Sequence, residues 1–173
     1  TASIGDLQPK THASNSKDSI QKLNIERLLG QHDAAIADYT EAIRLNPDYA
    51  EVYNNRGISQ SLLGQHDKAI ADYTVAIRLK PDYAIAYHNR ALAKTRHEDF
   101  DSAVVDYTEA ICLNSNYAEA YAHRGVAKAE LGNIDEARSD LQIALGLTEQ
   151  QRNADFKALV KKWLQRLDER ECN

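Results

Sequence analysis

The chain has 173 residues, a formal net charge of −5, and 43% hydrophobic and 27% charged residues, as expected of a soluble folded protein. The mild acidity argues against a nucleic-acid-binding protein, which needs a basic face for phosphate, and no apolar run approaches the about 18 residues that cross a membrane. Cys112 and Cys172 form no CxxC motif and predict no disulfide framework, which favours a cytoplasmic protein.

Residues 1–15 form a polar N-terminal segment. The segment has no apolar core, so it is not a secretory signal as it stands. Because the sequence starts at Thr1 and contains no methionine, we expect a processed chain or a segment of a longer protein. We interpret residues 1–15 as a flexible segment or linker.

The chain then repeats itself with a period of 34 residues. The stretch LLGQHDAAIADYTEAIRLNPDYA, which begins at Leu28, returns at Leu62 with three changes. Self-similarity at such a period is the signature of a stack of helical repeats. Aligned at this period, the sequence divides into four units, which are 16–49, 50–83, 84–117 and 118–151.

Each unit is predicted to contain two helices and a tight turn. The spacing of Ala69, Tyr73 and Ala76 places them on one helix face. Gly64 is suited to end a first helix, and Pro81 follows a second helix that it cannot continue. The predicted helices span 17–29, 33–45, 50–63, 67–79, 84–97, 101–113, 118–131 and 135–147.

Packing between the helices is predicted from small and large residues at fixed positions of the repeat. Gly57 and its equivalents Ala91 and Gly125 allow close approach of a neighbouring helix. The rings of Tyr73 and Tyr107 fill the space beside that contact.

The turns carry two further features. Asp48 followed by Glu51, and Asn116 followed by Glu119, resemble capping boxes. Unit three has Glu98 where the other units have the turn glycine.

Charges recur at the same period. We predict an ion pair between the two helices of each unit, with the charged groups within about 6 Å, that sets the register of the stack more dependably than it adds stability. Ligand binding by these charges is the alternative. The acidic residues are Asp38, Asp72, Asp106 and Asp140, and the basic residues are Lys22, Arg56, Arg90 and Arg124.

Residues 152–173 fall outside the repeat and are predicted to form an amphipathic capping helix and a tail. A stack of repeats needs a terminal cap over its last apolar face. Membrane or partner binding by this helix is the alternative. The apolar stripe consists of Phe156, Leu159, Val160, Trp163, Leu164 and Leu167.

The repeated small residues, Tyr, Ala and Pro resemble the tetratricopeptide repeat, whose unit has 34 residues. Unit one departs from the pattern in its first helix, at Ser19 and Leu23. The resemblance implies an all-α fold, a right-handed α-solenoid of helix–turn–helix repeats with a C-terminal capping helix. It also implies a protein–protein interaction scaffold, in which the first helices line a concave groove that binds a peptide segment of a partner protein.

The alignment places polar residues along this predicted groove. Asn55 and Asn89 are equivalent, and Gln21 and His123 occupy the same repeat position. A column of amides can pair with a peptide backbone regardless of its sequence, although the same amides can simply be hydrated. The predicted peptide-binding residues are Asn55, Asn89 and His123 at the centre, with Asn54, His88, Arg96, Glu119, Gln21 and Asn24 around them.

Tetratricopeptide repeat co-chaperones hold a C-terminal carboxylate with a set of Lys, Asn and Arg side chains. Here the basic places are taken by Ile20, Ile85 and Asn89. A chaperone-tail clamp is therefore not expected, and we predict a neutral or mixed-charge partner segment of unknown identity.

We predict no enzyme activity, cofactor or metal site. The glycines leave no phosphate-binding loop, and His88 and His123 could come near each other but have no third ligand in view. Three alternatives stay open: a structural spacer or self-assembly module, the targeting domain of a larger enzyme, and occupation of the groove by residues 1–15.

Overall fold

The computed structural model describes residues 30–171, which form helices and contain no strand. The helices are α2 (His32–Leu45), α3 (Ala50–Leu62), α4 (His66–Leu79), α5 (Ala84–Arg96), α6 (Phe100–Leu113), α7 (Ala118–Glu130), α8 (Ile134–Gln150) and α9 (Ala154–Glu171). The predicted helix 17–29, the segment 1–15 and the candidate residues Gln21 and Asn24 lie outside the described residues.

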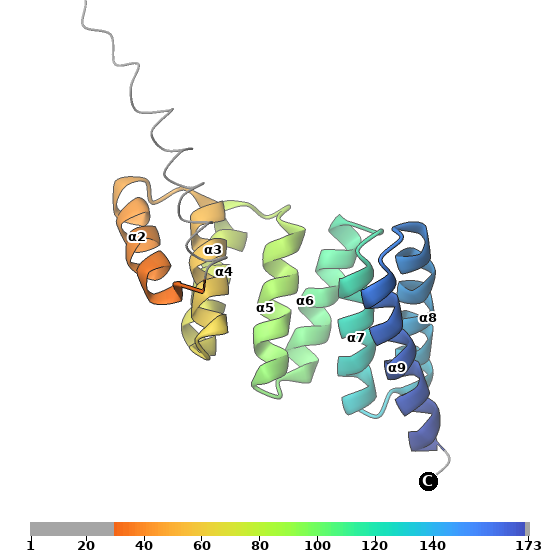
Figure 1. The fold of residues 1–173 in the computed structure, drawn as a ribbon. Coiled ribbons are helices and arrows are strands. Elements are labelled where there is room, and N and C mark those ends of the chain that lie inside the picture. The colour runs from red at the N-terminus through yellow and green to blue at the C-terminus, as the bar shows by residue number, and fades with distance from the viewer. Residues whose placement is uncertain (1–29, 172–173) are drawn as a thin grey trace, which may run out of the picture.

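The helices follow one another along a stack, with α2 at one end and α8 and α9 at the other (Figure 1). Each helix packs against the next one in the chain, and α3, α5, α7 and α9 also contact one another in succession. We call these four the first helices, and α2, α4, α6 and α8 the second helices. The arrangement confirms the predicted helical solenoid. None of the described helices has the length and apolar content needed to cross a bilayer.

The core is built from tyrosine and alanine at equivalent positions of successive units. Tyr39, Tyr73 and Tyr107 are buried, and Leu141 takes the same place in unit four. Gly57 packs on one of these rings, because an added Cβ would lie 2.7 Å from Cε1 of Tyr73. The predicted close contact of helices at this position is therefore confirmed.

Three turns use glycine in the left-handed conformation, and the fourth does not. The φ angles of Gly64 and Gly132 are 74° and 82°, while Glu98 has a φ of 59° at the equivalent position. The side chain of Glu98 makes this conformation costly, whereas glycine adopts it freely. Unit three therefore carries local strain that the glycine turns avoid, and Arg152, between α8 and α9, shares the left-handed conformation with a φ of 56°.

The predicted capping boxes at Glu51 and Glu119 are wrong. The residues that precede these helices are Tyr49 and Tyr117, and neither makes a side-chain capping hydrogen bond. The side-chain oxygen of Asn114 instead accepts a hydrogen bond from the backbone N–H two residues later, at 3.1 Å. The amide therefore stabilises the turn rather than the start of the helix.

The last helix, α9, covers the apolar face of α8. Val160 and Leu167 are buried in a cluster with Leu141 and Ala144. Since α9 packs against α8 and also contacts α7, it takes the place that a first helix of a further unit would occupy. The capping role is thus fulfilled by continuing the stack, and α9 becomes part of the layer of first helices.

Candidate functional site

The repeated ion pair holds the two helices of each unit together. Asp72, Asp106 and Asp140 are buried. In each pair, the guanidinium makes two hydrogen bonds to the carboxylate, which gives a fixed mutual orientation. The pairs are Arg56–Asp72, Arg90–Asp106 and Arg124–Asp140, and the closest N–O distance in each is 2.7 Å. The predicted pairing is confirmed in these three units; Lys22 lies outside the described residues.

Each of these arginines also reaches the preceding unit. The Nη1 atom of Arg56 donates a hydrogen bond to Thr40 at 3.0 Å. The same bond joins Arg90 to Thr74 and Arg124 to Thr108, at 3.1 Å in both. These side chains therefore fix how consecutive units stack.

A second cation completes this cluster in two units. Lys94 lies 2.8 Å from Asp106, and Lys128 lies 3.0 Å from Asp140. In unit two the equivalent residue is Gln60, whose Oε1 atom is buried without a hydrogen-bond partner. Unit two thus has a less complete polar cluster than units three and four.

The layer of first helices contains a pocket of about 200 Å³ between α3 and α5. It is lined by Ile58, Ser61, Leu62, Tyr73, Asn89, Leu92 and Arg96. Leu62 is 60% exposed, so the apolar part of this pocket is open to a partner. Arg96 is exposed, and no carboxylate in residues 30–171 forms an ion pair with it. The pocket therefore combines an apolar wall with an amide and an available positive charge.

The predicted amides form a short chain beside this pocket. Asn89 donates a hydrogen bond to Oδ1 of Asn54 at 3.0 Å, and Asn54 donates to Oδ1 of Asn55 at 3.4 Å. Asn54 is only 2% exposed, while Asn55 and Asn89 are partly exposed. Asn54 therefore holds the two flanking amides in place and offers almost no surface of its own.

The two histidines lie together between α5, α7 and α9. Nε2 of His88 is 3.1 Å from Nδ1 of His123. Tyr117 packs on His88 and Trp163 on His123, with ring centroids 4.9 and 5.6 Å apart. Burial lowers the pKa of both imidazoles to about 4, so both are neutral at pH 7. His88, at 8% exposure, is an internal residue.

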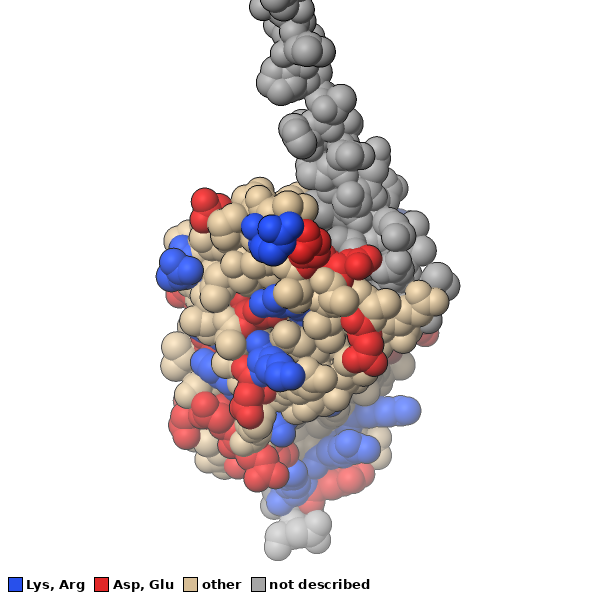
Figure 2. Space-filling view, turned by 90° about the vertical axis from the view of Figure 1, so that its left-hand side faces the viewer, with Lys and Arg blue, Asp and Glu red and all other residues tan. Residues whose placement is uncertain are grey.

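The predicted site residues Glu119 and Arg96 lie at opposite ends of their first helices. Glu119 is in the first turn of α7, whereas Arg96 is the last residue of α5. No group of three or more His, Cys, Asp or Glu side chains is placed to hold a metal ion in the described part of the chain. Acidic and basic side chains are interspersed over the end of the stack that carries α2 (Figure 2).

Sequence reasoning missed a second pocket, which α9 forms with α7 and α8. Trp163, Arg166 and Val126 are among the residues that line it. The apolar stripe of α9 contained one signal, because it includes Trp163. Arg166 lies outside that stripe, and nothing in the pattern indicated that it borders a pocket.

Family comparisons agree with the repeat period. The family described as TPR repeat matches residues 24–64 and 62–98, and the family described as tetratricopeptide repeat matches residues 88–161. No curated protein sequence gives a significant match.

Solved structures with the same fold are numerous. The first TPR of Spaghetti (RPAP3), bound to the HSP90 peptide SRMEEVD, is 28% identical with a TM-score of 0.65 and covers 72% of this chain and 94% of its own. The Arabidopsis OM64 TPR domain is 32% identical with a TM-score of 0.61, covering 68% and 94%. The TPR2B domain of yeast Sti1, in a complex with pHsp70, is 22% identical with a TM-score of 0.68, covering 70% and 97%, and supports the fold alone. The chain therefore belongs to the tetratricopeptide repeat family of helical protein-interaction modules.

Proposed function

We propose that the layer of first helices binds an extended peptide segment of a partner protein, with the pocket between α3 and α5 at the centre of the site. The single observation that carries this proposal is the pocket's composition, which joins an exposed apolar wall to Asn89 and to the unpaired Arg96. The first TPR of RPAP3, whose structure holds the HSP90 peptide SRMEEVD, supports the same kind of partner.

The apolar wall supplies most of the expected binding energy. Ile58, Leu62 and Leu92 line the pocket from two neighbouring first helices. Full burial of one leucine-sized side chain contributes about 1.5–3 kcal/mol. Part of this is offset by the loss of motion on association, so we expect a partner with more than one apolar contact.

The amide chain supplies orientation. An asparagine side chain carries both a donor and an acceptor, which match the C=O and N–H of a peptide group. We propose that Asn55 and Asn89 contact the partner, while Asn54 positions them through the hydrogen bonds that it makes to both. The predicted contacts of His123, His88 and Glu119 remain predictions.

A peptide array with purified protein tests the proposal, and a selected peptide then serves in fluorescence anisotropy. We expect Leu92→Ser to weaken binding about tenfold or more, because it removes one apolar contact. The double variant Asn55→Ala, Asn89→Ala should also bind more weakly. Val105→Ser is the matched control, since Val105 is 67% exposed on the second helix α6. Unchanged affinity in both groove variants would rule out this site.

Self-assembly is a second candidate, favoured by apolar side chains at both ends of the described stack. Leu45 of α2 is 70% exposed and Leu159 of α9 is 40% exposed. Exposed apolar surface at the ends of a repeat array invites stacking between chains. Light scattering over a range of concentrations tests this, because a monomeric mass at every concentration would exclude self-assembly.

A further inference from the structure

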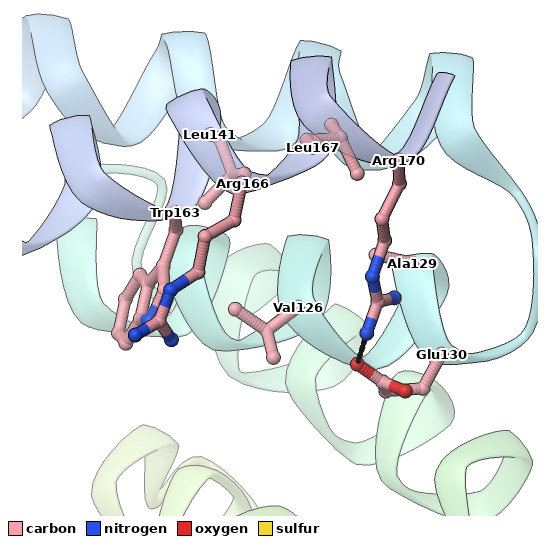
Figure 3. Close-up of a pocket in the computed structure, with 8 residues that line it drawn as sticks. All are labelled: Val126, Ala129, Glu130, Leu141, Trp163, Arg166, Leu167 and Arg170. Carbon is pink, nitrogen blue, oxygen red and sulfur yellow. Dashed lines mark hydrogen bonds and ion pairs between the residues drawn. The ribbon is translucent and has the colours of Figure 1, made fainter. Parts of the chain in front are cut away.

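The pocket formed by the capping helix has the features of a ligand site. Its volume is about 140 Å³, and α7, α8 and α9 all contribute to it. An engineered apolar cavity of about 150 Å³ in another protein binds benzene, so this volume suits one leucine or phenylalanine side chain. The lining residues are Val126, Ala129, Glu130, Leu141, Trp163, Arg166, Leu167 and Arg170 (Figure 3).

Two arginines border this pocket, and only one of them is paired with a described carboxylate. Figure 3 shows Trp163 and Arg166 along one side and the Arg170–Glu130 ion pair, at 2.9 Å, along the other, with Val126 between them. The charge of Arg170 is thereby neutralised. Arg166 is exposed, and none of the described carboxylates pairs with it. One available positive charge thus stands beside an apolar recess.

From this geometry we infer that the α9 pocket is a second subsite of the groove, which binds a leucine or phenylalanine side chain flanked by a carboxylate of the same partner segment. This inference rests on the proposed peptide-binding function. Capping alone requires the burial of Val160 and Leu167 against α8. It requires neither an open recess nor an unpaired arginine beside it.

The two pockets resemble each other in chemistry and lie in the same layer. Each combines an apolar recess with one unpaired arginine, Arg96 in the α3–α5 pocket and Arg166 in the α9 pocket. Neighbouring helix axes are about 8–10 Å apart, so two steps along the first helices, from α3–α5 to α7–α9, amount to roughly 20 Å. An extended chain covers about 3.3 Å per residue, which places the two apolar anchors of a partner about six residues apart.

The probe is a synthetic peptide with this spacing, acetyl-Leu-Asp-Ser-Gly-Ser-Gly-Leu-Asp-amide. Trp163 is the only tryptophan of the chain, so its emission reports directly on the α9 pocket. We expect a saturable change in emission, and at least tenfold tighter binding than for the peptide in which the second Leu is Ser, because the second contact becomes intramolecular. Replacing both Asp residues of the peptide by Asn should weaken binding.

Protein variants separate this inference from the function on which it rests. Arg166→Gln should weaken binding of the two-leucine peptide at least fivefold. Lys162→Gln removes the same charge from an exposed position of the same helix and should leave binding unchanged. If Arg96→Gln weakens binding while Arg166→Gln and the Trp163 emission show no effect, the second subsite is overturned and the groove function stands. Absence of binding at 1 mM peptide also overturns the second subsite. The peptide array described above tests the groove function independently.

Discussion

His88 and His123 should make this protein less stable as the pH is lowered from 7 to 5. The two rings share a contact of 3.1 Å between Nε2 and Nδ1 inside an aromatic cluster. Two neutral imidazoles can form one N–H···N hydrogen bond across such a contact. A charged ring there is poorly hydrated, and charging both rings would place two donors face to face. Protonation therefore favours the unfolded chain.

The size of the effect follows from the pKa values. Burial lowers the pKa of both rings to about 4 in the folded protein, against about 6.5 in the unfolded chain. The contribution to stability is therefore fully present above pH 6.5 and is lost as the pH falls toward 4. Between pH 7 and 5 one such group lowers the free energy of unfolding by about 2 kcal/mol, and the two groups together lower it by about 2–4 kcal/mol. That is a large part of the 5–15 kcal/mol typical of a folded domain.

Urea unfolding followed by helical circular dichroism at pH 7 and pH 5 measures this loss. The comparison uses the double variant His88→Gln, His123→Gln, in which the pH-dependent part should shrink by that amount. His97→Gln is the matched control, because the side chain of His97 is 43% exposed. If the wild type and the double variant lose the same free energy of unfolding between the two pH values, the reasoning about the buried pair is refuted.

Two further predictions use one repeat unit as the template for another, with urea unfolding at pH 7 as the measurement. The double variant Gln60→Lys, Lys68→Glu copies the polar cluster of unit four around Asp72 and removes a buried unpaired oxygen. The free energy of unfolding should therefore rise by about 1 kcal/mol. Equal stability of the double variant and of Lys68→Glu alone would contradict this. Glu98→Gly should raise the free energy of unfolding by up to about 1 kcal/mol, because it relieves the backbone strain of a residue with a side chain at positive φ. Gly64→Ala should lower the free energy of unfolding for the converse reason. A loss of stability in Glu98→Gly would show that the turn is not strained.

The repeat period made much of the packing predictable. Because Tyr73 and Tyr107 occupy equivalent positions, the same helix contact recurs, and one aligned pair predicts the others. The same reasoning predicted the Arg90–Asp106 pair, since a charge that recurs on each of two facing helices finds its partner in every unit. Such contacts depend only on local spacing and on the neighbouring unit.

The candidate site was less predictable, because it depends on which side of each first helix is exposed. Asn54 and Asn55 are adjacent in sequence, yet Asn54 is buried and Asn55 is partly exposed. A rotation of one residue along a helix, about 100°, separates the two environments. Arg166 shows the same limit, because its pocket exists only through the way α9 joins the first helices.

The hydrogen bonds from arginine to threonine make the joints between units interchangeable. Arg90 bonds to Thr74 in the preceding unit, just as Arg56 bonds to Thr40. Deleting residues 50–83 as a block would bring Arg90 opposite Thr40 and recreate a joint of the same chemistry. The length of such a protein can therefore change by whole units through duplication or loss of a gene segment, while the joints that carry its stability stay the same. Each gained or lost unit would then lengthen or shorten by one step the layer of first helices, which we propose as the partner-binding surface.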